Sequence, residues 1–287
     1  MAKSEMTLSI QLVPTTFGLA AVFAWGCSDF LGGFGSRRAN PYFLTGISHV
    51  GGLVLALTLA LSSHAAFPPV PSVLWAMLAG ATGGATLSVF YGALSTGKMG
   101  LTAAIAAVAG AAIPAAVGIL TEGFPGTVAL VGFALAATGI WLIARPETGG
   151  LSARGLAIAV FCGVGFACFY IFIKQAGDIP AFWGAACSRF AALVAVSLIV
   201  AFGRHTAPMD APRAGIGFAA GMLDVTGTIC FIRASQTGRL DAAVMLTSLY
   251  PAITVILARI FLREHFTRWK IVGILAALIA VPLIATH

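Results

Sequence analysis

The chain has 287 residues, of which 59% are hydrophobic and only 9% charged, and its mean hydropathy is +1.00. Soluble domains carry about 25% charged residues, so this composition excludes an ordinary water-soluble core and predicts a membrane protein. The net charge of +7 comes without a basic run long enough to follow a phosphate backbone, and no nucleic-acid partner is expected. The five cysteines form no C-x-x-C pair, so neither a metal nor a cofactor is expected.

Ten apolar segments approach the roughly 20 residues that a helix needs to cross a bilayer. The first is full length and leads directly into the next, so no cleavable signal peptide is expected. The fold class predicted is therefore an all-α membrane protein with ten transmembrane helices. These spans are Thr15–Phe34, Tyr42–Ser62, Val73–Ser95, Leu101–Thr121, Thr127–Ala144, Gly155–Lys174, Ala181–Phe202, Gly215–Ser235, Ala242–Leu262 and Trp269–Ala285.

The sequence repeats itself. Phe90–Met99 reads FYGALSTGKM and Phe231–Leu240 reads FIRASQTGRL, and Val131-Gly132 recurs at the same offset as Val272-Gly273. Similarity at a fixed offset indicates internal repeats, which we place at 1–148 and 149–287, five helices each. Because five is odd, the second copy must enter the membrane from the opposite face. The repeats are thus predicted to be inverted, with a substrate site at the midplane between them.

Lysine and arginine are unevenly distributed between the two sets of connections. By the positive-inside rule the richer set is cytoplasmic, so both termini are expected to be extracytoplasmic. The membrane is expected to be a bacterial cytoplasmic (inner) membrane. The poorer set holds Lys3, Lys174, Arg239 and Arg233 near a helix end. The richer set holds Arg37, Arg38, Lys98, Arg145, Arg154, Arg204, Arg213, Arg263, Arg268 and Lys270.

Each half carries the same ordered signature: a Thr-Gly-[Lys/Arg] turn, a proline, a glutamate and a Val-Gly pair. This order, with Ala24-Trp25-Gly26 near the start and Ser188-Arg189 in the seventh span, resembles the drug/metabolite transporter superfamily, in particular its EamA-type exporters. Ser48-His49, the repeat partner of Ser188-Arg189, departs from the family pattern. The signature comprises Thr96-Gly97-Lys98, Pro114, Glu122 and Val131-Gly132 in the first half, and Thr237-Gly238-Arg239, Pro251, Glu264 and Val272-Gly273 in the second.

The resemblance implies secondary transport of small metabolites, commonly export of amino acids or related compounds. It also implies a cavity lined by the first, third, fourth, sixth, eighth and ninth spans. On that basis the aromatic and hydroxyl side chains of these spans are candidate substrate contacts, although aromatic residues in membrane helices more often pack or face lipid. The candidates are Tyr91, Phe169, Tyr170, Ser248 and Tyr250.

Two acidic residues lie within spanning segments, where ionisable groups are costly and usually functional. Asp29 follows Trp25 by four residues, so the two share a helix face. A ring and a carboxylate together suit an amine or a quaternary cation. Asp224 lies mid-span with Thr228 one turn on. The alternatives are a structural hydrogen bond for Asp29, to helix ends or to nearby arginines, and an ion pair of Asp224 with Arg189 or Arg233.

Two basic residues within the spans leave alternatives open. His49 can gain or lose a proton near neutral pH and is a candidate for proton coupling together with Asp29 and Asp224, but it can equally bond a backbone carbonyl. Arg189 can clamp a substrate carboxylate with its planar fork, or hold helices together.

No H-E-x-x-H, Walker or G-x-S-x-G motif occurs, so an enzyme is not expected and the energy must come from a gradient. We expect a monomeric secondary transporter that exports a small amine-containing or cationic metabolite, with the lipid bilayer, the substrate and protons as its partners. The alternatives are an amino-acid or aromatic-compound exporter that uses Arg189, and a non-transporting membrane scaffold with a closed interior.

Overall fold

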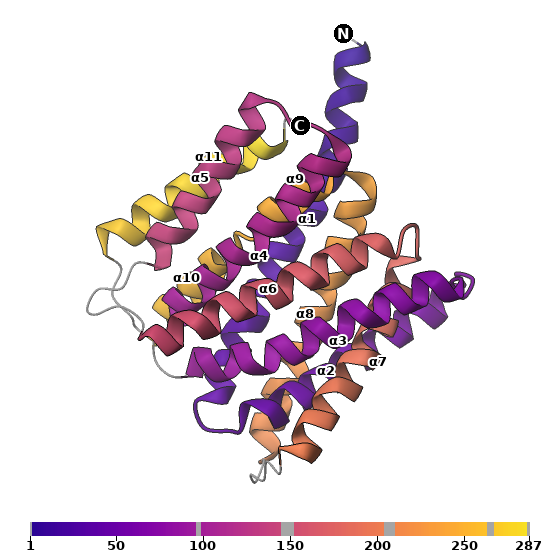
Figure 1. The fold of residues 1–287 in the computed structure, drawn as a ribbon, viewed down its shortest axis with the longest axis vertical. Coiled ribbons are helices and arrows are strands. Elements are labelled where there is room, and N and C mark those ends of the chain that lie inside the picture. Colours follow the sequence, from indigo (N-terminus) through magenta and orange to yellow (C-terminus); the bar gives the residue numbers. More distant parts are fainter. Residues whose placement is uncertain (1, 96–98, 145–151, 204–209, 263–266, 286–287) are drawn as a thin grey trace.

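The computed structural model describes residues 2–95, 99–144, 152–203, 210–262 and 267–285, and these ranges contain helices and connecting turns without a strand (Figure 1). The all-α prediction is confirmed for this part of the chain. The helices are α1 (Ala2–Ser36), α2 (Pro41–Ser62), α3 (Val70–Ser95), α4 (Met99–Glu122), α5 (Thr127–Ala144), α6 (Ala153–Gln175), α7 (Ala181–Phe202), α8 (Ala211–Thr237), α9 (Leu240–Thr247), α10 (Tyr250–Leu262) and α11 (Arg268–Ala285).

Within the described ranges, nine helical segments are long and apolar enough to cross a membrane, and Thr127–Ile143 is a shorter apolar helix. Each predicted span coincides with one helix except the ninth. That span is divided into α9 and α10 by a break at Ser248–Leu249, just before Pro251. Proline lacks a backbone N–H and so cannot continue the hydrogen bonding of the preceding turn.

Several helices extend beyond their apolar spans. The chain is helical from Ala2 through Pro14, although the prediction began only at Thr15. Helix α8 starts at Ala211, where the Asp210 side chain accepts a hydrogen bond from the Arg213 N–H at 3.0 Å. Hydropathy follows the apolar residues alone, whereas a capped helix continues into its polar first turn.

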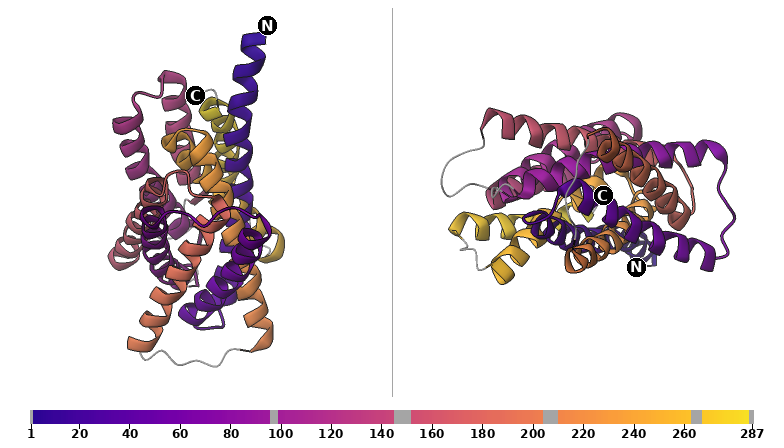
Figure 2. Two further views of the ribbon diagram at one scale, coloured as in Figure 1. Left: turned by 90° about the vertical axis from the view of Figure 1, so that its right-hand side faces the viewer. Right: turned by 90° about the horizontal axis from the view of Figure 1, so that it is seen from below.

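The helices of the two halves are interleaved (Figures 1 and 2). Helix α1 packs along α8 and α3 packs along α6, while α2 packs against α7 and α8, and α5 packs along α11. Exchanging the halves maps the α1–α8 packing onto α6–α3, and the α2–α8 packing onto α7–α3. This two-fold pattern fits a repeat; that the repeats are inverted stays a prediction.

Glycines at equivalent positions permit the closest crossings. A Cβ atom on Gly80 of α3 would collide with the carbonyl oxygen of Ser188 on α7, and one on Gly221 of α8 would collide with that of Ser48 on α2. Small residues let membrane helices approach to backbone contact. These crossings hold α7 against α3 and α2 against α8, and so determine where Arg189 and His49 lie.

Candidate functional site

A pocket of about 540 Å³, including its open mouth, lies among α1, α3, α6, α7, α8 and α10. Its charged lining comprises two carboxylates and one guanidinium, and much of the remainder is aromatic or glycine. The lining residues are Trp25, Asp29, Gly80, Gly83, Gly84, Leu87, Phe166, Phe169, Tyr170, Ser188, Arg189, Asp224, Thr228 and Tyr250.

Asp29 reaches the pocket from α1. Trp25 lies one turn earlier on the same helix face and lines the same pocket, as their spacing predicts. Asp29 is only 7% exposed, yet none of the hydrogen bonds and ion pairs among the described residues involves its carboxylate. A buried carboxylate without a partner is energetically costly, so this position can gain from a bound cation or proton.

Asp224 of α8 is buried to the same degree but has a partner. Its Oδ2 forms an ion pair with Nη1 of Arg189 from α7. The Arg189 Nη2 donates a hydrogen bond to the Thr228 hydroxyl at 2.5 Å, and its Nη1 lies 3.4 Å from Nδ1 of His49 on α2. The partner of Asp224 is therefore Arg189 and not Arg233, and the Arg189 guanidinium links α7 to α8 and α2.

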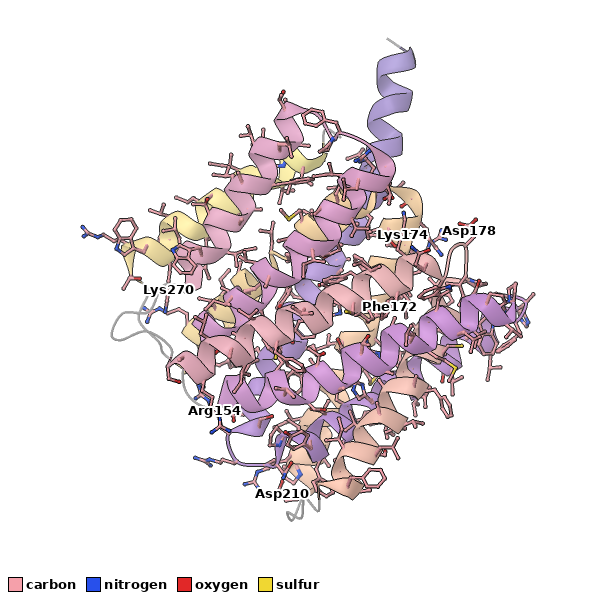
Figure 3. The ribbon with its side chains drawn as sticks, in the orientation of Figure 1. Arg154, Phe172, Lys174, Asp178, Asp210 and Lys270 are labelled. Atoms are coloured by element: carbon pink, nitrogen blue, oxygen red, sulfur yellow. The ribbon has the colours of Figure 1, made fainter. Side chains whose placement is uncertain are left out.

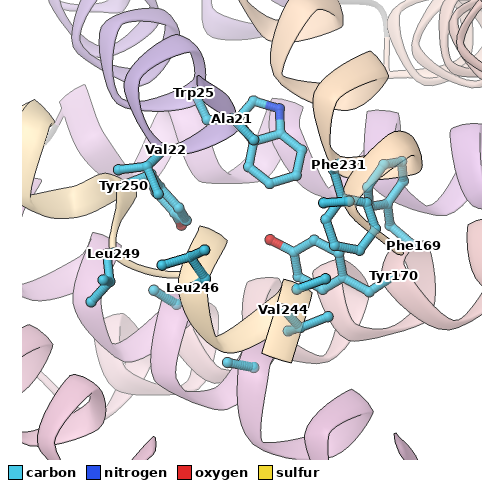
Figure 4. Close-up of a cluster of buried hydrophobic side chains, with 14 of the residues drawn as sticks. Ala21, Val22, Trp25, Phe169, Tyr170, Phe231, Val244, Leu246, Leu249 and Tyr250 are labelled. Atoms are coloured by element: carbon cyan, nitrogen blue, oxygen red, sulfur yellow. The ribbon is translucent and has the colours of Figure 1, made fainter. Parts of the chain in front are cut away.

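The rings of Trp25, Phe169 and Tyr170 form an aromatic wall of the pocket, and Phe231 packs against them (Figure 4). The Trp25 ring lies 6.0 Å from the Tyr170 ring and 5.7 Å from the Phe231 ring, centroid to centroid, and Tyr170 and Phe231 are 4.9 Å apart. The indole N–H of Trp25 donates to the backbone carbonyl of Asp224 at 3.1 Å. This bond fixes the indole of α1 against α8, beside Asp29.

Three predicted site residues do not line the pocket. Tyr91 is fully buried behind it, with its hydroxyl 3.3 Å from that of Ser28. Ser248 donates to the Val244 carbonyl at 2.7 Å and so closes the last turn of α9. His49 touches the site only through Arg189. Their functional roles stay predictions.

Conversely, Phe166, Leu87, Ser188 and the α3 glycines line the pocket although they were not among the predicted site residues. Phe166 shares a helix face with Tyr170, and this spacing could have revealed it. The glycines gave no separate signal, because small residues in membrane helices usually serve packing.

Residues 153–286 match the EamA-like transporter family. The match covers helices α6 to α11 in the second half of the chain. The resemblance to EamA-type members of the drug/metabolite superfamily, read from the repeated motifs, is thereby confirmed. The family match indicates a membrane transporter.

No curated protein matches the sequence. Among solved structures, one named only "Crystal structure of protein" is similar, with a TM-score of 0.78 and 13% identity over 94% of this chain and 95% of that chain. At this identity the similarity concerns the fold alone.

Several motif and loop residues lie outside the described residues: Thr96, Gly97, Lys98, Arg145, Arg204, Arg263 and Glu264.

Proposed function

We propose that this protein is a secondary transporter that exports a small amine-containing or cationic metabolite across a bacterial cytoplasmic membrane. The observation that carries the proposal is the carboxylate of Asp29, which lines an aromatic pocket and has no cationic partner among the described residues. An aromatic face and a carboxylate both attract an ammonium group. A pocket between the halves also favours transport over the closed interior that a scaffold would have.

The charges of the pocket favour a substrate with one positive charge. Arg189 neutralises Asp224, so the three charged lining groups leave one net negative charge at Asp29. The alternative of an amino-acid exporter needs Arg189 to bind a substrate carboxylate. That guanidinium is already bonded to Asp224 and Thr228, and a substrate carboxylate would have to displace a buried ion pair.

We further propose that Asp29 exchanges the cation for a proton, so that a proton gradient drives export. The same carboxylate cannot hold both, and alternation between them couples the two movements. Asp224 can take part only when Arg189 leaves it, and His49 only through Arg189. A carboxylate at the centre of a bilayer costs at least about 2.5–3.5 kcal/mol, and its neutralisation by either ligand offsets that cost.

Binding to the purified protein tests the substrate class. We expect 2-phenylethylamine to raise the unfolding temperature by mass action. Phenylalanine, which has the same ring and amine plus a carboxylate, should bind more weakly, and so should 1,5-diaminopentane, whose second ammonium finds Asp224 occupied. Asp29→Asn should weaken amine binding about 30-fold, the lower end of the cost of removing one member of a buried charge pair. Tighter binding of phenylalanine, retained by Asp29→Asn, would favour the amino-acid alternative.

Orientation is tested separately. We propose that both termini are extracytoplasmic and that the connection before α6 is cytoplasmic. Lys174 and Asp178 lie at one end of the bundle, and Arg154 lies at the other (Figure 3). In intact cells, an impermeant maleimide should label Asp178→Cys and leave Ser152→Cys unlabelled, with the parent protein as the blank. The opposite labelling would reverse the proposed topology.

A further inference from the structure

A cluster of charged side chains joins the two halves at the end of the bundle that carries Lys174. Glu122, at the end of α4, belongs to the first half; Lys174, Arg239 and Asp241 belong to the second. The Lys174 Nζ lies 3.3 Å from Glu122 Oε1, and the backbone N–H of Leu240 donates to Glu122 Oε2 at 3.0 Å. We call Glu122, Lys174, Arg239 and Asp241 the ion-pair cluster.

Arg239 is the centre of this cluster. Its guanidinium donates to the backbone carbonyls of Glu122 at 2.8 Å and Gly123 at 2.5 Å, and to both carboxylate oxygens of Asp241 at 3.1 and 2.8 Å. Asp241 is fully buried, and its carboxylate raises the pKa of the Arg239 guanidinium above the ordinary value. Gly118 of α4 contacts Asp241 closely, so the start of α9 lies directly on α4.

The ion-pair cluster lies just beyond the aromatic wall of the pocket. Lys174 follows Tyr170 by one helical turn on α6, and its Nζ donates at 2.6 Å to the carbonyl of Ser235, which follows Phe231 by one turn on α8. Along α6 and α8, the packed rings of Tyr170 and Phe231, with Trp25 against them (Figure 4), therefore lie between Asp224 and this end of the bundle. The ion-pair cluster lies beyond these rings.

Most of the bonds that the cluster makes across the halves can be exchanged with water. The side chains of Lys174 and Glu122 are 32% and 25% exposed and that of Arg239 is 22% exposed. Partly exposed ion pairs contribute little free energy. Arg239 can also release the two carbonyls of the first half while it retains Asp241. The contacts between halves are thus weak enough to break repeatedly, whereas the bond that neutralises the buried carboxylate stays within the second half.

We propose that the ion-pair cluster is the gate that closes the pocket towards this end of the bundle, and that it separates in each transport cycle. The gate rests on the proposed transport function but not on the identity of the substrate. Opening moves α4 and the turn at Gly123 away from Arg239 and Lys174. The aromatic rings beneath then separate, because Trp25 belongs to the first half and Tyr170 and Phe231 to the second.

Accessibility of the pocket tests the gate without any substrate. Ser188→Cys places a thiol in the pocket lining, where the native hydroxyl has no hydrogen bond among the described residues. An impermeant cationic thiol reagent is applied, in intact cells or oriented vesicles, to the face that carries Asp178. The labelling rate of Asp178→Cys serves as the reference for an exposed thiol. Adding Glu122→Gln should raise the labelling rate of Ser188→Cys about two- to fivefold, the equivalent of one partly exposed pair.

The matched control is Asp210→Asn. Asp210 forms an ion pair with Arg213 at 3.0 Å, and this pair is more exposed and lies within α8 and its N-cap, at the other end of the bundle. The variant should leave the labelling rate unchanged. Lys174→Gln should act like Glu122→Gln and serves if the latter does not fold. The charge swap Glu122→Lys with Lys174→Glu should restore part of the parent rate. Labelling and transport at the parent rate in both single variants would overturn the gate.

The result separates the gate from the proposed substrate class. If labelling becomes faster in the variants but the parent protein fails to bind amines, the gate stands and the cationic substrate is refuted. If the parent protein binds amines but labelling is unchanged in the variants, the cationic substrate stands and the gate is refuted. If the cluster only stabilised the fold, the single variants would lower the unfolding temperature without raising the labelling rate of folded protein.

Discussion

The two acidic residues of the pocket are nearly equally buried but differ in what neutralises them. Asp29 on α1 is 7% exposed and Asp224 on α8 is 8% exposed. Asp224 is bonded to Arg189, whereas Asp29 has no such partner among the described residues. The difference teaches that burial alone does not identify a binding carboxylate. A paired carboxylate fixes helices, and an unpaired one is available to a ligand.

The largest effect is expected from breaking the pair of Asp224. Arg189→Gln leaves that carboxylate buried without its cation and should lower stability by about 3–5 kcal/mol, measured as a loss of unfolding temperature in detergent. Replacing both partners together, as Arg189→Met with Asp224→Leu, should recover most of it. Asp29→Asn should be no less stable than the parent. An equal loss in Asp29→Asn would mean that Asp29 has a structural partner too.

The second prediction uses pH to distinguish the two carboxylates. Because a proton and a cation compete for Asp29, 2-phenylethylamine should bind up to about tenfold more tightly per unit rise in pH, until Asp29 is fully ionised. Asp29→Asn should make amine affinity independent of pH. Folded Asp224→Asn protein should keep the pH dependence of the parent. The other ionisable groups at the site are Arg189, Tyr91, Tyr170, Tyr250 and, behind Arg189, His49.

A flat profile in the parent protein would remove the case for proton exchange at Asp29. Proteoliposomes loaded at different internal pH values provide the corresponding transport measurement. A pH dependence that survives in both Asp29→Asn and Asp224→Asn would assign the coupling to another group.

The third prediction concerns the ring beside Asp29. Trp25→Phe removes the indole hydrogen bond to the Asp224 carbonyl and weakens the aromatic face offered to a cation. The attraction of a cation to an aromatic face contributes about 0.5–2 kcal/mol, so a weaker and less firmly held ring should lower amine affinity roughly two- to tenfold. Calorimetry against Trp141→Phe is the matched comparison, because Trp141 on α5 is 54% exposed and lies outside the pocket. Equal affinities in the two variants would exclude Trp25 from binding.

The smallest effect is expected at Gly83. A Cβ there would lie 3.0 Å from the Phe169 ring, so Gly83→Ala should shift that ring and narrow the pocket. We expect a two- to threefold change in amine affinity, well within the cost of a small packing change. Gly46→Ala is the control, since its Cβ would meet only a Val196 methyl group at 3.9 Å. No difference between the variants would place the ligand away from α3.

Much of the fold was predictable because each apolar run predicts its own helix, whatever the rest of the chain does. Long apolar runs give the spans, whereas the repeat indicated by the similarity of Phe90–Met99 to Phe231–Leu240 stays a prediction. The break between α9 and α10 was not predicted, since α4 with Pro114 continues through its proline while the ninth span is interrupted before Pro251. What a proline does to a membrane helix depends on the neighbouring helices, which the sequence does not give.

The site was predictable only where local spacing decides it. The four-residue step from Trp25 to Asp29 fixes a shared helix face whatever the packing. The partner of Asp224 depends instead on how α7 crosses α8, and the sequence left Arg189 and Arg233 equally open. Arg233 in fact lies 6.0 Å from the Phe17 ring. The pairing of Glu122 with Lys174 likewise needs the two halves to be docked.

The interleaving of the halves also has a consequence for biogenesis. Trp25 and its hydrogen-bond acceptor on α8 are 199 residues apart, and at about 5–20 residues per second a ribosome needs roughly 10–40 s to make that stretch. Throughout this interval α1 is in the membrane without its main neighbour, with the carboxylate of Asp29 unshielded. Newly inserted helices must therefore be retained beside the insertion machinery until α8 emerges. A chain terminated after the first half would be left as a substrate for membrane proteases.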